Sequence, residues 1–150
     1  MRKYAIFFTA LTLIFALVGC FSAIDYSLPK DPTEFNTFVF VNPNDHEDTY
    51  ASFEYNGRTY IPYGTLKNRI SGKDVGDCLG YIVQDGEKLT DTRVFTLRDD
   101  KEGNFLAILQ YEGFMDPPVF YRAIDTAKKE IDIPWIVGSL GYDFWDDGDE

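Results

Sequence analysis

The chain has 150 residues and a net charge of −11, because 25 acidic side chains outnumber 14 basic ones. This length fits one domain with a single core, and 13 phenylalanines and 10 tyrosines supply ample apolar material for it. A surface this negative repels the phosphates of nucleic acid, which excludes nucleic-acid partners. The charge permits cations and basic peptides as partners, or serves solubility alone.

The first 20 residues have the pattern of an export signal. Two basic residues follow Met1, and residues 4–18 form an apolar run with only two threonines as polar breaks. The end of this run, Leu17-Val18-Gly19-Cys20, resembles the cleavage box of a bacterial lipoprotein signal peptide at all four positions. The resemblance implies that the chain is cut before Cys20 and that this cysteine carries a diacylglycerol. We therefore expect a protein of the bacterial cell envelope, lipid-anchored to the membrane on its extracytoplasmic side.

Two other interpretations of the leader compete with this one. A retained transmembrane helix needs about 20 apolar residues, whereas residues 4–18 provide 15. An ordinary secretory signal would be cut at an Ala-x-Ala site, and this window holds none. Cleavage before Cys20 removes Arg2 and Lys3, which leaves 12 basic side chains against 25 acidic ones and a net charge of −13.

Composition divides the mature chain into three parts. Prolines and scattered charges predict a tether that follows the lipidated cysteine, over residues 20–36. Within it, Ile24, Tyr26 and Leu28 alternate as an edge strand would. A single β-rich domain is expected over residues 37–142, and an acidic tail over residues 143–150.

Apolar runs between turn residues predict six or seven strands, over residues 37–41, 50–55, 58–63, 78–83, 92–97, 105–109 and 119–124. The run 105–109 is apolar on both parities, which is typical of a central strand covered on both faces or of a buried helix. Asp132 and Pro134 predict a short C-terminal helix with Trp135 packed inward. The fold class is therefore all-β, a mostly antiparallel small barrel or sandwich with a short C-terminal helix; the alternative is α+β.

The strongest local signal is Asn56-Gly57 between two aromatic-rich runs. A type I′ turn requires positive φ at both central positions, and Asn-Gly meets that requirement. A two-residue turn fixes the register, so Tyr55 is expected opposite Arg58 and Phe53 opposite Tyr60, on the face that looks into the core.

The sequence holds no catalytic signature. His46 is the one histidine, so it cannot complete a zinc site with a second histidine. Cys78 has no intramolecular partner once Cys20 carries lipid, and its place beside an apolar run predicts an inert strand cysteine. Two carboxylates suffice for glycoside hydrolysis, but 25 acids offer too many pairs for any one to be singled out.

Oxygen-rich loops leave calcium binding open. The candidate ligands are weak, because they do not match the twelve-residue calcium loop; they are Asn44, Asp45, Glu47 and Asp48, with Asn42 beside them. The tyrosines of the predicted hairpin region could stack on sugars or peptides if several shared an exposed face.

We therefore expect a membrane-anchored lipoprotein that presents a small, acidic, non-catalytic binding domain, without catalytic residues, metal or other cofactor. Its ligand would be an envelope protein, a peptide or a glycan. The alternatives are a small envelope hydrolase with paired carboxylates and a calcium-stabilised structural domain.

Overall fold

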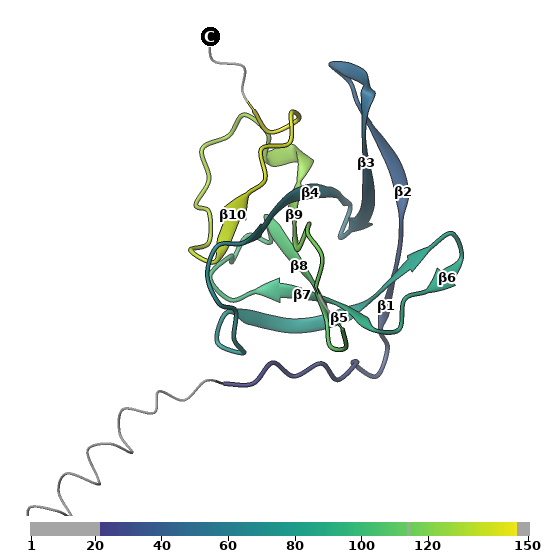
Figure 1. The fold of residues 1–150 in the computed structure, drawn as a ribbon, viewed down its shortest axis with the longest axis vertical. Helices are drawn as coiled ribbons and strands as arrows, with labels where there is room; N and C mark the ends of the chain where they lie inside the picture. Colours follow the sequence, from purple (N-terminus) through teal and green to yellow (C-terminus); the bar gives the residue numbers. More distant parts are fainter. Residues whose placement is uncertain (1–21, 114, 147–150) are drawn as a thin grey trace, which may run out of the picture.

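The computed structural model describes residues 22–113 and 115–146 (Figure 1). These residues form ten strands and one 3-10 turn, η1 (Ile124–Thr126). The strands are β1 (Thr33–Asn36), β2 (Phe38–Asn42), β3 (Asp45–Tyr55), β4 (Arg58–Leu66), β5 (Val75–Gln84), β6 (Glu87–Lys88), β7 (Thr92–Leu97), β8 (Phe105–Gln110), β9 (Phe120–Ala123) and β10 (Val137–Ser139).

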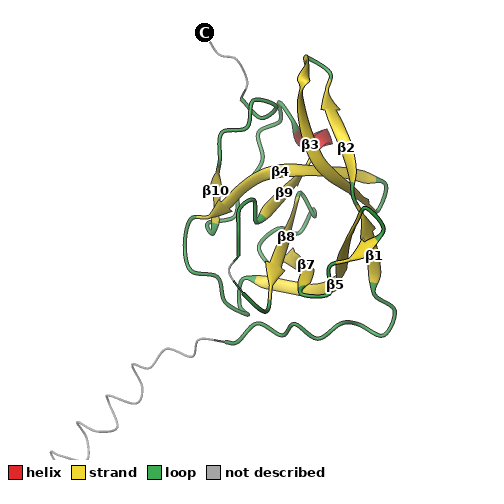
Figure 2. Cartoon of the chain, turned by 45° about the vertical axis from the view of Figure 1, so that its right-hand side comes forward, coloured by secondary structure: helices red, strands yellow, loops and turns green. Residues whose placement is uncertain are grey.

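One curled sheet contains all of these strands. Its order is β1-β5-β7-β8-β9-β4-β3-β2, with β6 added to β5 and β10 added to β4. The strands at the two ends of this order, β1 and β2, are consecutive in the chain and joined through Thr37 alone. The sheet therefore curls into a half-barrel (Figure 2), and its predominantly β character agrees with the fold class predicted from the sequence.

The structure corrects two details of that fold prediction. The described residues hold ten strands rather than six or seven, because β1, β6 and β10 also pair with the sheet. They hold no short C-terminal helix: Val137 N–H donates to the Pro134 carbonyl at 2.9 Å in a single turn, and the chain then joins β4 as β10. Trp135, predicted to pack inward, is 56% exposed. Throughout the described residues, no helix is long and apolar enough to cross a membrane.

Gly64 on β4 explains why the chain forms strand β10 where the sequence predicts a short helix. β10 pairs antiparallel with β4, with Ser139 opposite Gly64. A Cβ on Gly64 would lie 1.9 Å from the Gly138 carbonyl oxygen, so only glycine admits the β10 backbone at this point. The pairing partner lies some 70 residues earlier in the chain, and the capping signals at Asp132 and Pro134 do not report it.

Apolar side chains cover both faces of the sheet. Leu106 packs with Phe53 on one face, whereas its β8 neighbours Phe105 and Ala107 pack on the other, as predicted for a central strand. We name the two clusters the Phe53 core and the Phe105 core. The buried members of the Phe53 core are Phe35, Phe53, Tyr60, Ile82, Val94, Leu106 and Ala123. Those of the Phe105 core are Tyr63, Val75, Phe95, Leu97, Phe105, Ala107, Leu109, Val119, Phe120, Ile136 and Val137. Each large side chain buried in this way stabilises the fold by about 1.5–3 kcal/mol.

The Asn56-Gly57 hairpin forms as predicted. Both turn residues have positive φ, 50° and 74°, and the register places Phe53 opposite Tyr60 and Tyr55 opposite Arg58. Phe53 and Tyr60 are buried in the Phe53 core, with their rings stacked 5.9 Å apart.

The segment before β1, for which the sequence predicts a tether, lies against the body from Ser22 onward. The Gly72 N–H donates to the Ser22 carbonyl at 2.8 Å, and Arg93 Nε donates to the Tyr26 carbonyl at 2.9 Å. The Tyr26 ring meets Phe95 edge-on at 5.8 Å. The alternation of Ile24 and Tyr26 does not mark an edge strand, because residues 22–32 form none; both side chains instead pack on the Phe105 core.

The last described segment at the C-terminal side is also held against the body. Residues 143–146, predicted as the start of an acidic tail, include Phe144 and Trp145, whereas residues 147–150 lie outside the described part. Trp145 Nε1 donates to the Pro62 carbonyl at 2.6 Å, and the Arg122 guanidinium lies 4.7 Å from the Trp145 ring centre. These contacts fix the last described turn against β4 and β9.

Candidate functional site

Strand β2 carries three of the eight large apolar side chains that are exposed in the described residues. Phe38, Val39 and Val41 are 40%, 70% and 44% exposed. Their strand ends the sheet, and among the described residues its backbone pairs with β3 alone. The carbonyls and N–H groups of such an edge are a template for another strand, and natural sheets usually protect it with charges or proline. The residues of β2, Phe38–Asn42, carry neither.

The register of β2 on β3 gives the hairpin one covered side and one open side. Phe40 lies opposite Tyr50, and its ring packs edge-on against Phe144 at 5.4 Å, so the C-terminal segment covers that side. Val39 and Val41 lie opposite Ala51 and Thr49 on the other side, where all four residues are exposed.

A hollow of about 440 Å³ adjoins the foot of β2. Glu34, Asn36, Phe38 and Glu54 line it. The Tyr81 hydroxyl donates to Glu34 Oε1 at 2.7 Å, and Lys88 Nζ donates to the same oxygen. The bond from Lys88, with that from Tyr81, lowers the pKa of the exposed Glu34 carboxyl. The hollow therefore combines the Phe38 ring with the Glu54 carboxylate and with a Glu34 carboxylate that already pairs with Lys88, so Glu54 is the acid best placed to meet the cationic head of a lysine or arginine.

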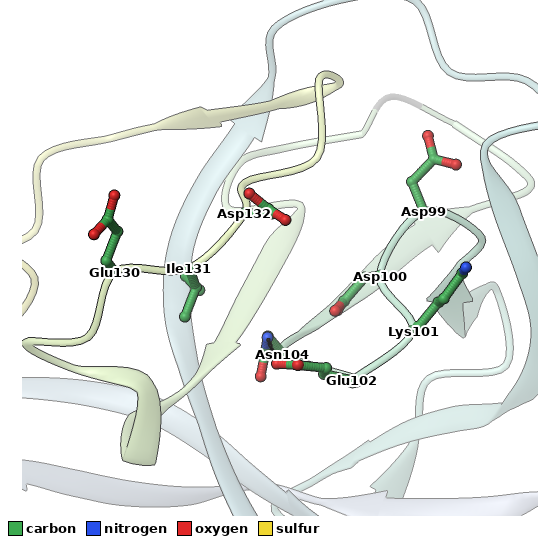
Figure 3. A pocket seen from close by; sticks show the side chains of 8 residues that line it. All are labelled: Asp99, Asp100, Lys101, Glu102, Asn104, Glu130, Ile131 and Asp132. Atoms are coloured by element: carbon green, nitrogen blue, oxygen red, sulfur yellow. Dashed lines mark hydrogen bonds between the residues drawn. The ribbon is translucent and has the colours of Figure 1, made fainter.

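A second, larger hollow of about 610 Å³ lies between the β7–β8 loop and residues 130–132 (Figure 3). Its lining is acidic: Asp99, Asp100, Lys101, Glu102, Asn104, Glu130, Ile131 and Asp132. Two of these carboxylates hold the loop itself, because Asp100 accepts the Phe105 N–H at 2.5 Å and Glu102 accepts Asn104 Nδ2 at 3.1 Å. Asp99 points away from Asp100 and Glu102 in Figure 3. The hollow can attract cations, but these acids do not converge on one reacting atom.

The calcium candidates lie at the tip of the β2–β3 hairpin, where their oxygens accept hydrogen bonds from the protein. Asp48 Oδ2 accepts Asn42 Nδ2 at 2.8 Å and the Tyr50 hydroxyl at 2.5 Å. Asp45 Oδ1 accepts the Glu47 N–H at 3.0 Å. The exposed Asn44 donates its N–H to the Asn42 side chain at 3.0 Å. Within residues 22–113 and 115–146, no group of three or more His, Cys, Asp or Glu side chains could hold a metal ion.

The other residues considered from the sequence are placed as follows. Tyr50, Tyr60 and Tyr63 are buried, so the tyrosines of the hairpin region do not share an exposed binding face. Cys78 is half-buried beside the Phe105 core, and burial raises the pKa of its thiol, which disfavours the reactive thiolate. Cys20 lies outside the described residues.

Comparisons with known proteins found no family model that matches the chain, and neither the curated proteins nor the solved structures include a significant match.

Proposed function

We propose that the chain is a bacterial envelope lipoprotein that presents a small, acidic, non-catalytic interaction domain outside the cytoplasm. The lipid anchor rests on the Leu17-Val18-Gly19-Cys20 cleavage box. The observation that carries the interaction role is the open edge of β2, a strand with three large exposed apolar side chains that pairs with β3 alone among the described residues. Exposed apolar surface of this kind marks sites of association.

The described N-terminus gives the anchor a short link. Ser22 is bonded to Gly72 on the body, and two residue steps separate it from Cys20. At about 3.4 Å per residue, the link spans at most roughly 7 Å. An acylated Cys20 would therefore hold the body close to the membrane surface. The excess of acidic side chains opposes this position, because anionic headgroups repel them.

The loop that receives Ser22 is suited to that position. Lys67, Arg69 and Lys73 are exposed on it. The exposed Arg98 reaches it as well, because its Nε donates to the Gly72 carbonyl at 3.4 Å. Each basic side chain close to an anionic membrane contributes about 1 kcal/mol to the attraction of the protein to that membrane. The basic residues thus gather where the link requires the body to meet headgroups.

The geometry gives less support to the rival functions. A hydrolase with paired carboxylates would use the acidic hollow, where Asp100 and Glu102 are engaged in hydrogen bonds that hold the β7–β8 loop. A calcium-stabilised domain would use the hairpin tip, where Asp48 already accepts two donors. We therefore prefer the non-catalytic role.

Metabolic labelling tests the anchor. The full chain is expressed in a bacterium fed an alkyne fatty acid, and the label on the protein is read on a gel. Cys20→Ala should abolish labelling and release the protein from the membrane fraction, whereas the matched control Cys78→Ala should leave both unchanged. Labelling that persists in Cys20→Ala would refute the lipoprotein proposal.

A further inference from the structure

We infer that the outer edge of β2 binds an extended, basic segment of a partner protein by strand addition. This inference deepens the interaction role proposed above and does not depend on the lipid at Cys20. In this mode, main-chain hydrogen bonds along a sheet edge give affinity, and pockets for alternate side chains give specificity.

The backbone of β2 becomes available where the chain changes partners. β1 pairs in parallel with β5, and the Thr37 N–H makes the last bond to that strand, to the Val83 carbonyl at 2.9 Å. From Phe38 onward the chain pairs with β3 on one side. In the described residues no strand lies on its other side, and both views show β2 at the rim of the sheet (Figures 1 and 2).

The side chains around this edge favour an apolar strand with basic residues. Val39 and Val41, exposed on the open side of the hairpin, would pack against apolar side chains of an added strand. Acidic groups lie at both ends of β2: Glu34 and Glu54 line the hollow at its foot, and the exposed Asp45 and Glu47 lie at the hairpin tip.

Charge decides between a partner and a second copy. Without its leader the chain carries 12 basic and 25 acidic side chains, so two copies repel each other as they approach. Pairing of β2 with β2 of another copy would also bring the acidic groups at their ends together. A basic segment instead meets complementary charge, and the hollow beside Phe38 can receive one of its lysine or arginine side chains.

Peptide binding tests the inference. The full chain, in an uncharged detergent, is titrated into two fluorescent ten-residue peptides, one alternating valine with lysine and the other valine with glutamate, and anisotropy is measured. Only the lysine peptide should bind. Two N-methylated versions of that peptide, blocked at either set of alternate backbone nitrogens, distinguish strand addition from charge attraction. Alternate N–H groups point to opposite edges of a strand, so only one set faces β2. The version methylated on that set should bind at least tenfold more weakly, and the version methylated on the other set should bind as tightly as the unmodified peptide.

Variants locate the site. Val39→Lys should weaken binding at least tenfold, because a lysine on the edge opposes strand addition and repels a basic segment. Ile133→Lys is its matched control, since it adds the same charge at another exposed apolar residue, and it should bind normally. Glu54→Gln should weaken binding about threefold, while Glu87→Gln, an exposed glutamate outside this hollow, should not.

Three results would overturn the inference. These are equal binding of the two N-methylated peptides, equal loss of binding in Val39→Lys and Ile133→Lys, and a dimer in sedimentation that Val39→Lys dissociates, since a dimer would assign the edge to a second copy. Cys20→Ala should bind the peptide normally, so failure of the lipid anchor and failure of this inference give different results.

Discussion

Gly72 holds the first described residue, Ser22, against the body. A Cβ at this position would lie 2.3 Å from the Ala23 carbonyl oxygen and 2.5 Å from Ser22 Oγ, both too close for non-bonded atoms. Gly72→Ala should therefore release Ser22 and break its 2.8 Å hydrogen bond. The segment should stay attached from Tyr26, which Arg93 and Phe95 hold. The stability cost is that of one hydrogen bond and its local contacts, about 1 kcal/mol.

The same substitution lengthens the link. Its length becomes the six residue steps from Cys20 to Tyr26 in place of two, so its maximum span rises from about 7 Å to about 20 Å. Energy transfer from a dye on the body to a labelled lipid headgroup measures this change in vesicles. The dye is placed at Glu87→Cys, an exposed site, with Cys78→Ala to remove the other thiol. Gly72→Ala should reduce the transfer, and Lys73→Ala, the neighbouring exposed residue, should not. Unchanged transfer in acylated Gly72→Ala would refute the docking of Ser22.

Three further predictions concern stability. Gly57→Ala should cost about 1–2 kcal/mol of stability, because its φ of +74° strains a residue with a side chain. An added Cβ meets nothing within 4 Å, so this backbone strain is the whole cost. The thermal midpoint should fall by roughly 4–8 °C, and an unchanged midpoint would contradict the prediction. Asp125→Asn should cost under about 1 kcal/mol in urea unfolding at neutral pH. Hydrogen bonds from Arg58 hold the pKa of the Asp125 carboxyl below its ordinary 3.8, so this contribution is present above pH 3.8 and is lost as the pH falls through the lower, folded value; a difference that persists below that value would count against the pair. Burial raises the pKa of Tyr121 to about 12. The contribution of this neutral tyrosine to the free energy of unfolding is therefore fully present below pH 10.0, the ordinary pKa, and is lost as the pH rises from 10 to 12. Tyr121→Phe should lose less over that range, and equal losses would argue against a buried hydroxyl.

Local signals predicted the parts of the fold that depend on neighbouring residues. Asn56-Gly57 fixed both the turn and the register of the hairpin, because its backbone requirement is met within two residues. Residues 105–109 are all apolar, and this uninterrupted run predicted that both faces of the strand are buried. Each of these predictions needed no information about distant strands.

Predictions that depended on distant partners succeeded less well. Asp132 and Pro134 carry helix-start signals, yet Gly64 on β4 provides a backbone edge that takes the chain as a strand. The alternation of Ile24 and Tyr26 could not distinguish a free tether from a docked one, since Arg93 and Phe95 decide the outcome. Burial and hydrogen bonding thus settled what short-range patterns left open.

The candidate site was harder to predict than the fold. The run beginning at Phe38 was recognised as a strand, but its place at the end of the sheet follows from the order of eight strands. The sequence pattern of an apolar strand does not indicate whether the strand lies in the centre of a sheet or at its edge. The hollow at its foot has the same origin, because Glu34 and Glu54 come from β1 and β3.

The two proposed roles, membrane anchoring and partner binding, fall at opposite ends of the molecule. The described N-terminus, where Ser22 meets the basic loop, and the tip of the β2–β3 hairpin lie at opposite ends of the molecule in both views (Figures 1 and 2). In an acylated protein the short link holds the first end at the headgroups, so the hairpin and the open edge of β2 point away from the membrane. The net negative charge of the chain favours the approach of a basic partner. Orientation by the anchor and recognition at the edge strand therefore depend on different residues and can be altered separately.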